Sequence, residues 1–153
     1  FNILTHSKLF KVNLENSNVL DLYSGIGSFG LECISRGANK ITFVEQDKEV
    51  IEILNKNLQN LSVQNNAVII NNTIINFLEM DQLEKFDIIF LDPPFAEDKY
   101  IKELQLIFKK KICKDNYIVI VHRDQKTKEK LSNILNPLLV KVYGRSKIIF
   151  GRF

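Results

Sequence analysis

The chain has 153 residues, of which 45% are hydrophobic, and this size fits a single domain over residues 1–153 with a sizeable buried core. No apolar run reaches the roughly 18 residues that a membrane helix needs, which argues against a membrane protein. The two cysteines, Cys33 and Cys113, stand in no C-x-x-C spacing, and only two histidines are present, so we expect no metal. Reduced thiols are typical of a cytoplasmic protein.

The charge is unevenly distributed along the chain. Residues 1–98 contain 7 Lys and Arg against 14 Asp and Glu, whereas residues 99–153 contain 14 against 4. The second half is therefore a candidate surface for a polyanion such as RNA. Ordinary solvated helix faces would give the same composition, so charge alone does not decide between the two.

Apolar runs alternate with amphipathic stretches along the chain. Helical spacing of apolar residues predicts one helix at 27–36, closed by Gly37, and a second that Asp47 caps and that runs to Leu61. Three further helices are predicted at 74–80, 99–109 and 126–135. Strands are predicted at 19–21, 41–45, 67–70, 86–91 and 117–121, and a closing hairpin at 140–143 and 148–153.

This alternation predicts an α/β fold, a three-layer sandwich with a mostly parallel sheet, helices on both faces and a C-terminal antiparallel hairpin. Ligands of such sheets bind beyond the carboxyl ends of the strands. Asp21, Glu45 and Asp92 each stand at a predicted strand end. We therefore expect a site on that edge. His122–Asp124, after the fifth strand, are candidates to face this site or to contact a phosphate, but a surface loop is the favoured expectation.

A glycine-rich segment, DLYSGIGSFG at residues 21–30, joins the first strand to the first helix. Gly25 and Gly27 allow a tight turn and a close approach of backbone to a ligand. Gly25–Gly30 also matches G-x-G-x-x-G, and Glu45 follows 20 residues after Gly25, as in dinucleotide-binding folds. An NAD-dependent oxidoreductase is therefore one candidate, and a purely structural βα turn is another.

Asp21 favours a different ligand. A dinucleotide loop presents a helix N-terminus to a pyrophosphate, which a neighbouring carboxylate would repel. S-adenosylmethionine (SAM) has no phosphate and carries a sulfonium and an ammonium, which suit a carboxylate. Glu45 would accept hydrogen bonds from ribose hydroxyls in either case.

The segment Asp92-Pro93-Pro94-Phe95 follows the fourth strand. Its two prolines make the loop stiff and leave its carbonyls free. The Asp92 carboxylate and the Pro93 carbonyl can each accept one N–H of an exocyclic amine, which aims the nitrogen lone pair at a methyl donor. Phe95 offers a ring on which a flipped-out base can stack. The alternative is a rigid turn with Phe95 in the core.

With these motifs, Ser35–Ala38 and the ending Tyr143–Lys147, the chain resembles the bacterial 16S ribosomal RNA (guanine-N2)-methyltransferases of type D. The resemblance implies a class I SAM-dependent fold with a seven-stranded sheet, cofactor SAM, and a monomer that methylates a guanine of small-subunit rRNA, either free or in the 30S particle. The Asp-Pro-Pro-Phe motif is shared with adenine-N6 methyltransferases, which leaves that activity as an alternative.

The resemblance also assigns residues. Asp92–Phe95 match the target-base loop, Glu45 matches the ribose acid, Gln46 lies beside the adenine, and Tyr23 either packs on SAM or closes the turn. Asp21, Ser24, Gly25 and Gly27 match the loop around the methionine part of SAM.

The chain departs from the family in two places. Asn71-Asn72-Thr73-Ile74 stands where the wider SAM-dependent class often has an acid for the adenine amine, so we expect Asn72 or Thr73 to serve there. We also expect that a basic N-terminal family stretch preceding Phe1 is missing.

Overall fold

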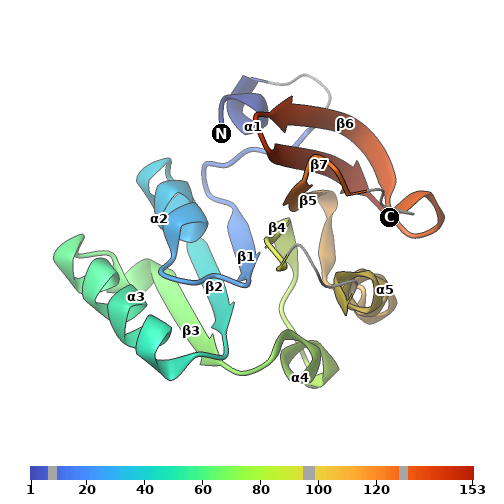
Figure 1. Cartoon of the computed structure of the whole chain (residues 1–153). Coiled ribbons are helices and arrows are strands. Elements are labelled where there is room, and N and C mark those ends of the chain that lie inside the picture. The colour runs from blue at the N-terminus through green and yellow to red at the C-terminus, as the bar shows by residue number, and fades with distance from the viewer. Residues whose placement is uncertain (7–9, 95–98, 128–130) are drawn as a thin grey trace.

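The computed structural model describes residues 1–6, 10–94, 99–127 and 131–153. Its strands form one seven-stranded sheet in the order β3-β2-β1-β4-β5-β7-β6 (Figure 1). The pairs among β1 to β5 are parallel, and β7 pairs antiparallel with both β5 and β6. The strands are β1 Asn18–Leu22, β2 Lys40–Glu45, β3 Ala67–Asn71, β4 Phe86–Leu91, β5 Cys113–Asp124, β6 Asn136–Tyr143 and β7 Ser146–Arg152.

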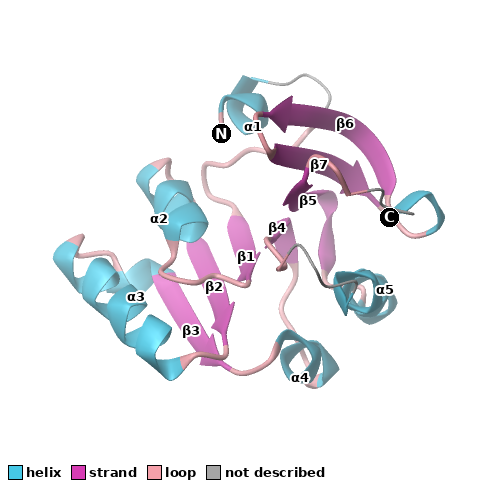
Figure 2. Cartoon of the chain, in the orientation of Figure 1, coloured by secondary structure: helices cyan, strands magenta, loops and turns pink. Residues whose placement is uncertain are grey.

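Helices cover both faces of the sheet (Figure 2). Residues of α2 and α3 belong to one buried apolar cluster and residues of α4 and α5 to another. The predicted three-layer α/β architecture is therefore confirmed. None of the described helices is long and apolar enough to cross a membrane. The α-helices are α1 Asn2–His6, α2 Ser28–Ser35, α3 Lys48–Asn60, α4 Ile74–Glu79 and α5 Lys99–Lys110, and the 3-10 helices are η1 Gln64–Asn66 and η2 Leu131–Asn133.

Local signals at the ends of two helices act as predicted. The Asp47 carboxylate accepts hydrogen bonds from the backbone N–H groups of Glu49 and Val50, which caps α3. Gly37 has φ +89° just after α2, the left-handed conformation that ends many helices. These caps fix where the chain leaves each helix and returns to the sheet.

The C-terminal third confirms the predicted closing hairpin, as β6 and β7, but differs from the prediction in the segment before it. An α-helix at 126–135 is wrong over the described residues, because 125–126 form a turn and only Leu131–Asn133 are helical, as a 3-10 turn. β5 continues to Asp124, and β6 begins at Asn136. Pro137 is tolerated there because β6 is an edge strand.

The parallel register brings two distant loops together. β1 pairs with β4 so that Leu22 lies beside Leu91, and with β2 so that Leu22 lies beside Val44. The chain therefore leaves β1, β2 and β4 at the same edge of the sheet. The glycine loop and the Asp92 loop start next to each other, although some seventy residues separate them.

Gly30 lets α2 approach the sheet closely. A Cβ at this position would lie 2.3 Å from Cε1 of Phe43 and 2.8 Å from Cγ2 of Ile41. Both neighbours belong to β2, so any side chain here would push the helix away from the strand. The third glycine of the G-x-G-x-x-G pattern is therefore a packing residue.

We predict that Gly30→Ala lowers the free energy of unfolding by about 1–3 kcal/mol, the usual cost of forcing an extra methyl into a packed core. Urea denaturation measures the change. Ser28→Ala, which adds no atom to the core because Ser28 is exposed on the same helix, is the control. A Gly30→Ala protein as stable as the parent would contradict this packing.

Candidate active site

The glycine loop after β1 is built from left-handed backbone. Tyr23, Gly25 and Gly27 have φ angles of +63°, +54° and +91°. A Cβ on Gly27 would lie 2.4 Å from Cδ1 of Leu54, whereas nothing lies within 4 Å of the position of a Cβ on Gly25. Tyr23 is the one non-glycine residue of the three, and such strained conformations cluster at functional sites.

The Glu45 carboxylate ties this loop to the next one. Oε2 accepts a hydrogen bond from Gly25 N at 3.0 Å, and Oε1 accepts from Gln46 N at 2.8 Å and from Asp47 N at 3.0 Å. A carboxylate offers about four lone-pair positions. About one therefore remains for a ligand hydroxyl, and a second ligand bond requires that Glu45 release one of its backbone partners.

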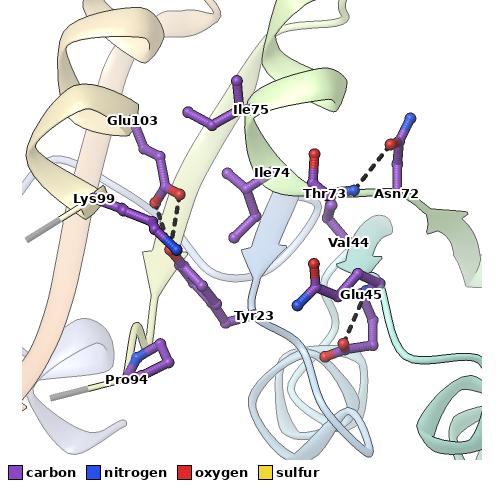
Figure 3. A pocket seen from close by; sticks show the side chains of 11 residues that line it. Tyr23, Val44, Glu45, Asn72, Thr73, Ile74, Ile75, Pro94, Lys99 and Glu103 are labelled. Carbon is purple, nitrogen blue, oxygen red and sulfur yellow. Dashed lines mark hydrogen bonds between the residues drawn. The ribbon is translucent and has the colours of Figure 1, made fainter. Parts of the chain in front are cut away.

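A cavity of about 380 Å³ opens beside these loops (Figure 3). Its wall contains five of the residues predicted to bind a cofactor and one residue of the Asp92 loop, Pro94. The wall combines polar side chains at the ends of β2 and β3 with apolar ones from α4. The lining residues are Tyr23, Val44, Glu45, Gln46, Asn72, Thr73, Ile74, Ile75, Pro94, Lys99 and Glu103.

Asn72 and Thr73 form part of the wall but have local partners. Oδ1 of Asn72 accepts from Thr73 N at 2.9 Å. Oγ1 of Thr73 accepts from Asn76 N at 3.2 Å and so caps α4. The Asn72 side-chain amide N–H groups and the Thr73 hydroxyl proton are the groups that these bonds leave for a ligand.

Ser24 and Asp21 lie outside the wall of this cavity. Ser24 is buried, and its Oγ has no hydrogen-bond partner among the described residues. Asp21 is 1% exposed beneath α2, where its Oδ2 accepts from Gly30 N at 3.0 Å. Asp21 thus holds the start of α2, and the structure does not place its carboxylate against a ligand's charges.

The loop after β4 carries Asp92, whose side chain is 43% exposed. His122 Nδ1 lies 2.7 Å from Asp92 Oδ1. Arg123 donates through Nη1 to the carbonyls of Pro93 at 3.4 Å and Pro94 at 3.1 Å. The predicted surface loop at His122–Asp124 is therefore wrong, because these residues extend β5. Phe95 lies outside the described residues.

Two further residues of the wall, Lys99 and Glu103, have no counterpart among the predicted site residues. Tyr23 Oη donates to Glu103, at 2.7 Å from Oε1 and 2.9 Å from Oε2. Glu103 is 3% exposed and shares the buried face of α5 with Tyr100, Leu104 and Ile107. The signal for it was present in the sequence, as an acid at an apolar position of an amphipathic helix.

A second cavity, of about 440 Å³, has no charged side chain among the described residues of its wall. It lies on the α1–α2 side of the sheet, and Phe29 and Phe90 stack there with ring centroids 3.9 Å apart. The first cavity is therefore the one with chemistry for a polar ligand.

The family of the chain follows from comparison with known sequences. The model of the family described as conserved hypothetical protein 95 matches residues 1–152. The chain belongs to this family. Relatives of the chain include the ribosomal RNA small subunit methyltransferases D of Haemophilus influenzae, 37% identical over 114 residues, and of Buchnera aphidicola subsp. Baizongia pistaciae, 32% identical over 153 residues.

These alignments differ in coverage. The first spans 73% of this chain and 59% of the H. influenzae relative, and the second spans 100% of this chain and 74% of the Buchnera relative. A crystal structure of an H. influenzae protein named as a methylase superposes with a TM-score of 0.80 at 32% identity, covering 90% of this chain and 87% of that one. The chain therefore has the class I methyltransferase fold.

A structure solved with S-adenosylhomocysteine bound shares this fold. It is named as a methyltransferase and superposes with a TM-score of 0.76 at 16% identity, covering 95% of this chain and 47% of that one. At this identity the likeness concerns the fold alone.

We predict that Asp21 makes stability pH-dependent. Burial, against the lowering effect of the Gly30 N–H and with smaller contributions from the nearby carboxylates Asp92 and Glu45, raises the pKa of Asp21 from 3.8 to about 7. Because the folded pKa is raised, the stabilising contribution is complete below about pH 4 and is lost as the pH rises through 7.

Asp21→Asn keeps an oxygen for Gly30 N but cannot ionise. The free energy of unfolding of this variant, measured relative to the parent, should therefore rise between pH 4 and pH 8. The rise is up to about 4 kcal/mol for a shift of three pKa units. Urea titrations at several pH values measure the difference. Asp81→Asn, at an exposed carboxylate, is the control, and its difference in free energy of unfolding from the parent should not change with pH. A pH-independent difference for Asp21→Asn as well would contradict the raised pKa of Asp21.

Proposed function

We propose that this chain is a SAM-dependent methyltransferase that methylates the exocyclic N2 amine of a guanine in 16S rRNA of the small ribosomal subunit. The observation that carries the proposal is the meeting of two loops at one sheet edge. The cavity beside the glycine loop offers places for a nucleoside, and the stiff Asp92–Pro94 loop next to it offers acceptors for an amine. The names of the family relatives support the reaction class and the rRNA substrate.

The residues of the cavity fit SAM. Beside the cavity, the glycine loop leaves open space above Gly25 that can accommodate the methionine part of SAM. The remaining lone pair of Glu45 suits a ribose hydroxyl, and Gln46, Asn72 and Thr73 supply polar groups for the adenine. Tyr23, held by Glu103, closes this wall on the side of the Asp92 loop. SAM supplies an electrophilic methyl group when bound.

The chain's own residues act by orienting the target amine. An exocyclic amine on a base is a weak nucleophile because its lone pair is delocalised into the ring. The Asp92 carboxylate and the Pro93 carbonyl each accept one amine N–H, which turns the lone pair out of conjugation and toward the methyl donor. The methylated nitrogen then loses a proton, which Asp92 or water accepts, and no covalent enzyme intermediate forms.

RNA as the partner agrees with the uneven charge, although part of that charge is used internally. Lys110 Nζ donates to the carbonyls of Glu79 and Met80 at the end of α4, and Lys114 pairs with Asp87 at 2.7 Å. Arg145, at the tip of the β6–β7 hairpin, lies 3.6 Å from the Asp124 carboxylate but is 87% exposed, and it is therefore a better candidate for a phosphate contact.

The glycine loop itself does not separate SAM from NAD. Asp21 is buried beneath α2, so its carboxylate does not stand against a pyrophosphate in the cavity. The preference for SAM therefore depends on the family and on the Asp92–Pro94 loop, which a hydride-transfer enzyme has no need for.

We predict that Asp92→Ala lowers the rate of methyl transfer by at least about 100-fold, because one of the two acceptors for the amine is lost. Transfer of labelled methyl from SAM to 30S particles and to free 16S rRNA measures the rate, and calorimetry with S-adenosylhomocysteine measures cofactor affinity, which should not change. Asp115→Ala, at an exposed carboxylate of β5, is the control. Retained turnover in Asp92→Ala would contradict the assigned role.

The target base has its own test. Digestion of the labelled rRNA followed by mass spectrometry should yield N2-methylguanosine. If the digest contained N6-methyladenosine instead, the target would be adenine rather than guanine, and the proposed mechanism would be unchanged.

A further inference from the structure

The end of β5 extends past its parallel partner and runs beside the Asp92 loop. β4 ends at Leu91, which pairs with Val121, whereas β5 continues for three more residues. These residues remain in a strand because β7 pairs with them on the other side, His122 with Ile148 and Arg123 with Lys147. The segment beside the proposed amine-binding loop is therefore held by a regular ladder.

His122 and Arg123 contact the loop in different ways. Consecutive residues of a strand point to opposite faces of the sheet. The His122 ring contacts the Asp92 side chain, with Nδ1 2.7 Å from Oδ1. Arg123 instead donates hydrogen bonds to the backbone carbonyls of Pro93 and Pro94. The loop is thus held at its carboxylate by one residue and at its carbonyls by the next.

The His122 contact orients the carboxylate. An ionised Asp92 can only accept hydrogen bonds, so Nδ1 of His122 is the donor. This bond fixes the rotation of the Asp92 side chain and uses lone-pair capacity on Oδ1 only. The other oxygen, Oδ2, remains to accept an amine N–H.

The Arg123 contact orients the backbone. Arg123 is only 2% exposed, and its guanidinium lies 4.4 Å from the centroid of the Tyr100 ring. A buried guanidinium is costly unless its N–H groups are bonded, so its position is fixed by its acceptors. Both bonds come from Nη1, whose two N–H groups have fixed directions in the guanidinium plane, and the Tyr100 ring packs against that guanidinium. A lysine ammonium has no such plane and does not hold its donors in these directions.

We propose that His122 and Arg123 are positioning residues for methyl transfer, which hold the Asp92 carboxylate and the Pro93–Pro94 carbonyls where the target amine needs them. This inference rests on the proposed function. Neither side chain lines the cavity that we assign to SAM. Their loss therefore lowers kcat and leaves cofactor affinity unchanged.

Arg123→Lys tests the backbone contact, with Arg152→Lys as the matched control. Arg152 also donates to a backbone carbonyl, that of Tyr117 at 2.8 Å, and lies 5.7 Å from the Tyr117 ring centroid, and neither of these contacts involves Asp92, Pro93 or Pro94. We expect Arg123→Lys to lower kcat by about 10- to 100-fold, since a displacement of about 1 Å can cost that much. Arg152→Lys should retain the parental kcat.

His122 gives a second test that does not depend on the folding of the Arg123 variant. His122→Asn keeps a donor close to the position of Nδ1, and His122→Val removes it. We expect His122→Asn to retain most of kcat and His122→Val to lose roughly 10-fold or more, with the affinity for S-adenosylhomocysteine within about twofold of the parent in both.

The two proposals fail differently. A parent protein that methylates no rRNA overturns the proposed function itself. An active parent, with Arg123→Lys as fast as Arg152→Lys or His122→Val as fast as His122→Asn, overturns the positioning role. A tenfold loss of cofactor affinity in these variants would also overturn it, because the residues would then act on the cofactor site.

Discussion

The parallel pairing of β1 with β4 is the constraint on which the site depends. It makes two segments some seventy residues apart in the chain leave the sheet side by side, one as the glycine loop and the other as the Asp92 loop. Each loop is then fixed by its own partners, Glu45 for the first and the end of β5 for the second. Without this pairing, the cavity beside the glycine loop and the Asp92 loop would be unrelated features.

Much of the fold could be predicted because its signals are local. β4 is an apolar run buried on both faces, and Asp47 and Gly37 mark helix ends by their own chemistry. The segment from residue 122 to residue 135 carried no such signals. His122–Asp124 are three polar residues after an apolar strand and resemble a loop, but β7 pairs with them from the far end of the sequence. Pattern along the chain does not reveal such a partner.

The site was predictable to a similar degree. Tyr23, Glu45, Gln46, Asn72 and Thr73 do come together in one cavity wall. Only Glu45 was expected there from its position at a strand end, and the others were expected mainly from the family resemblance. Asp21 was expected beside a ligand, but alternation along β1 turns its side chain under α2, where Gly30 N binds it. The contacts of Arg123 depend on how far β5 continues past β4, which no spacing in the sequence encodes.

The most direct test of the account is a calorimetric titration of the protein with S-adenosylhomocysteine and, separately, with NAD. It requires no knowledge of the RNA target and addresses the cavity on which the proposed function depends. We predict saturable heat with S-adenosylhomocysteine at one site per chain and none with NAD. Heat with NAD and none with S-adenosylhomocysteine would contradict the assignment of SAM to the cavity lined by Tyr23 and Glu45 and, with it, the proposed methyl transfer.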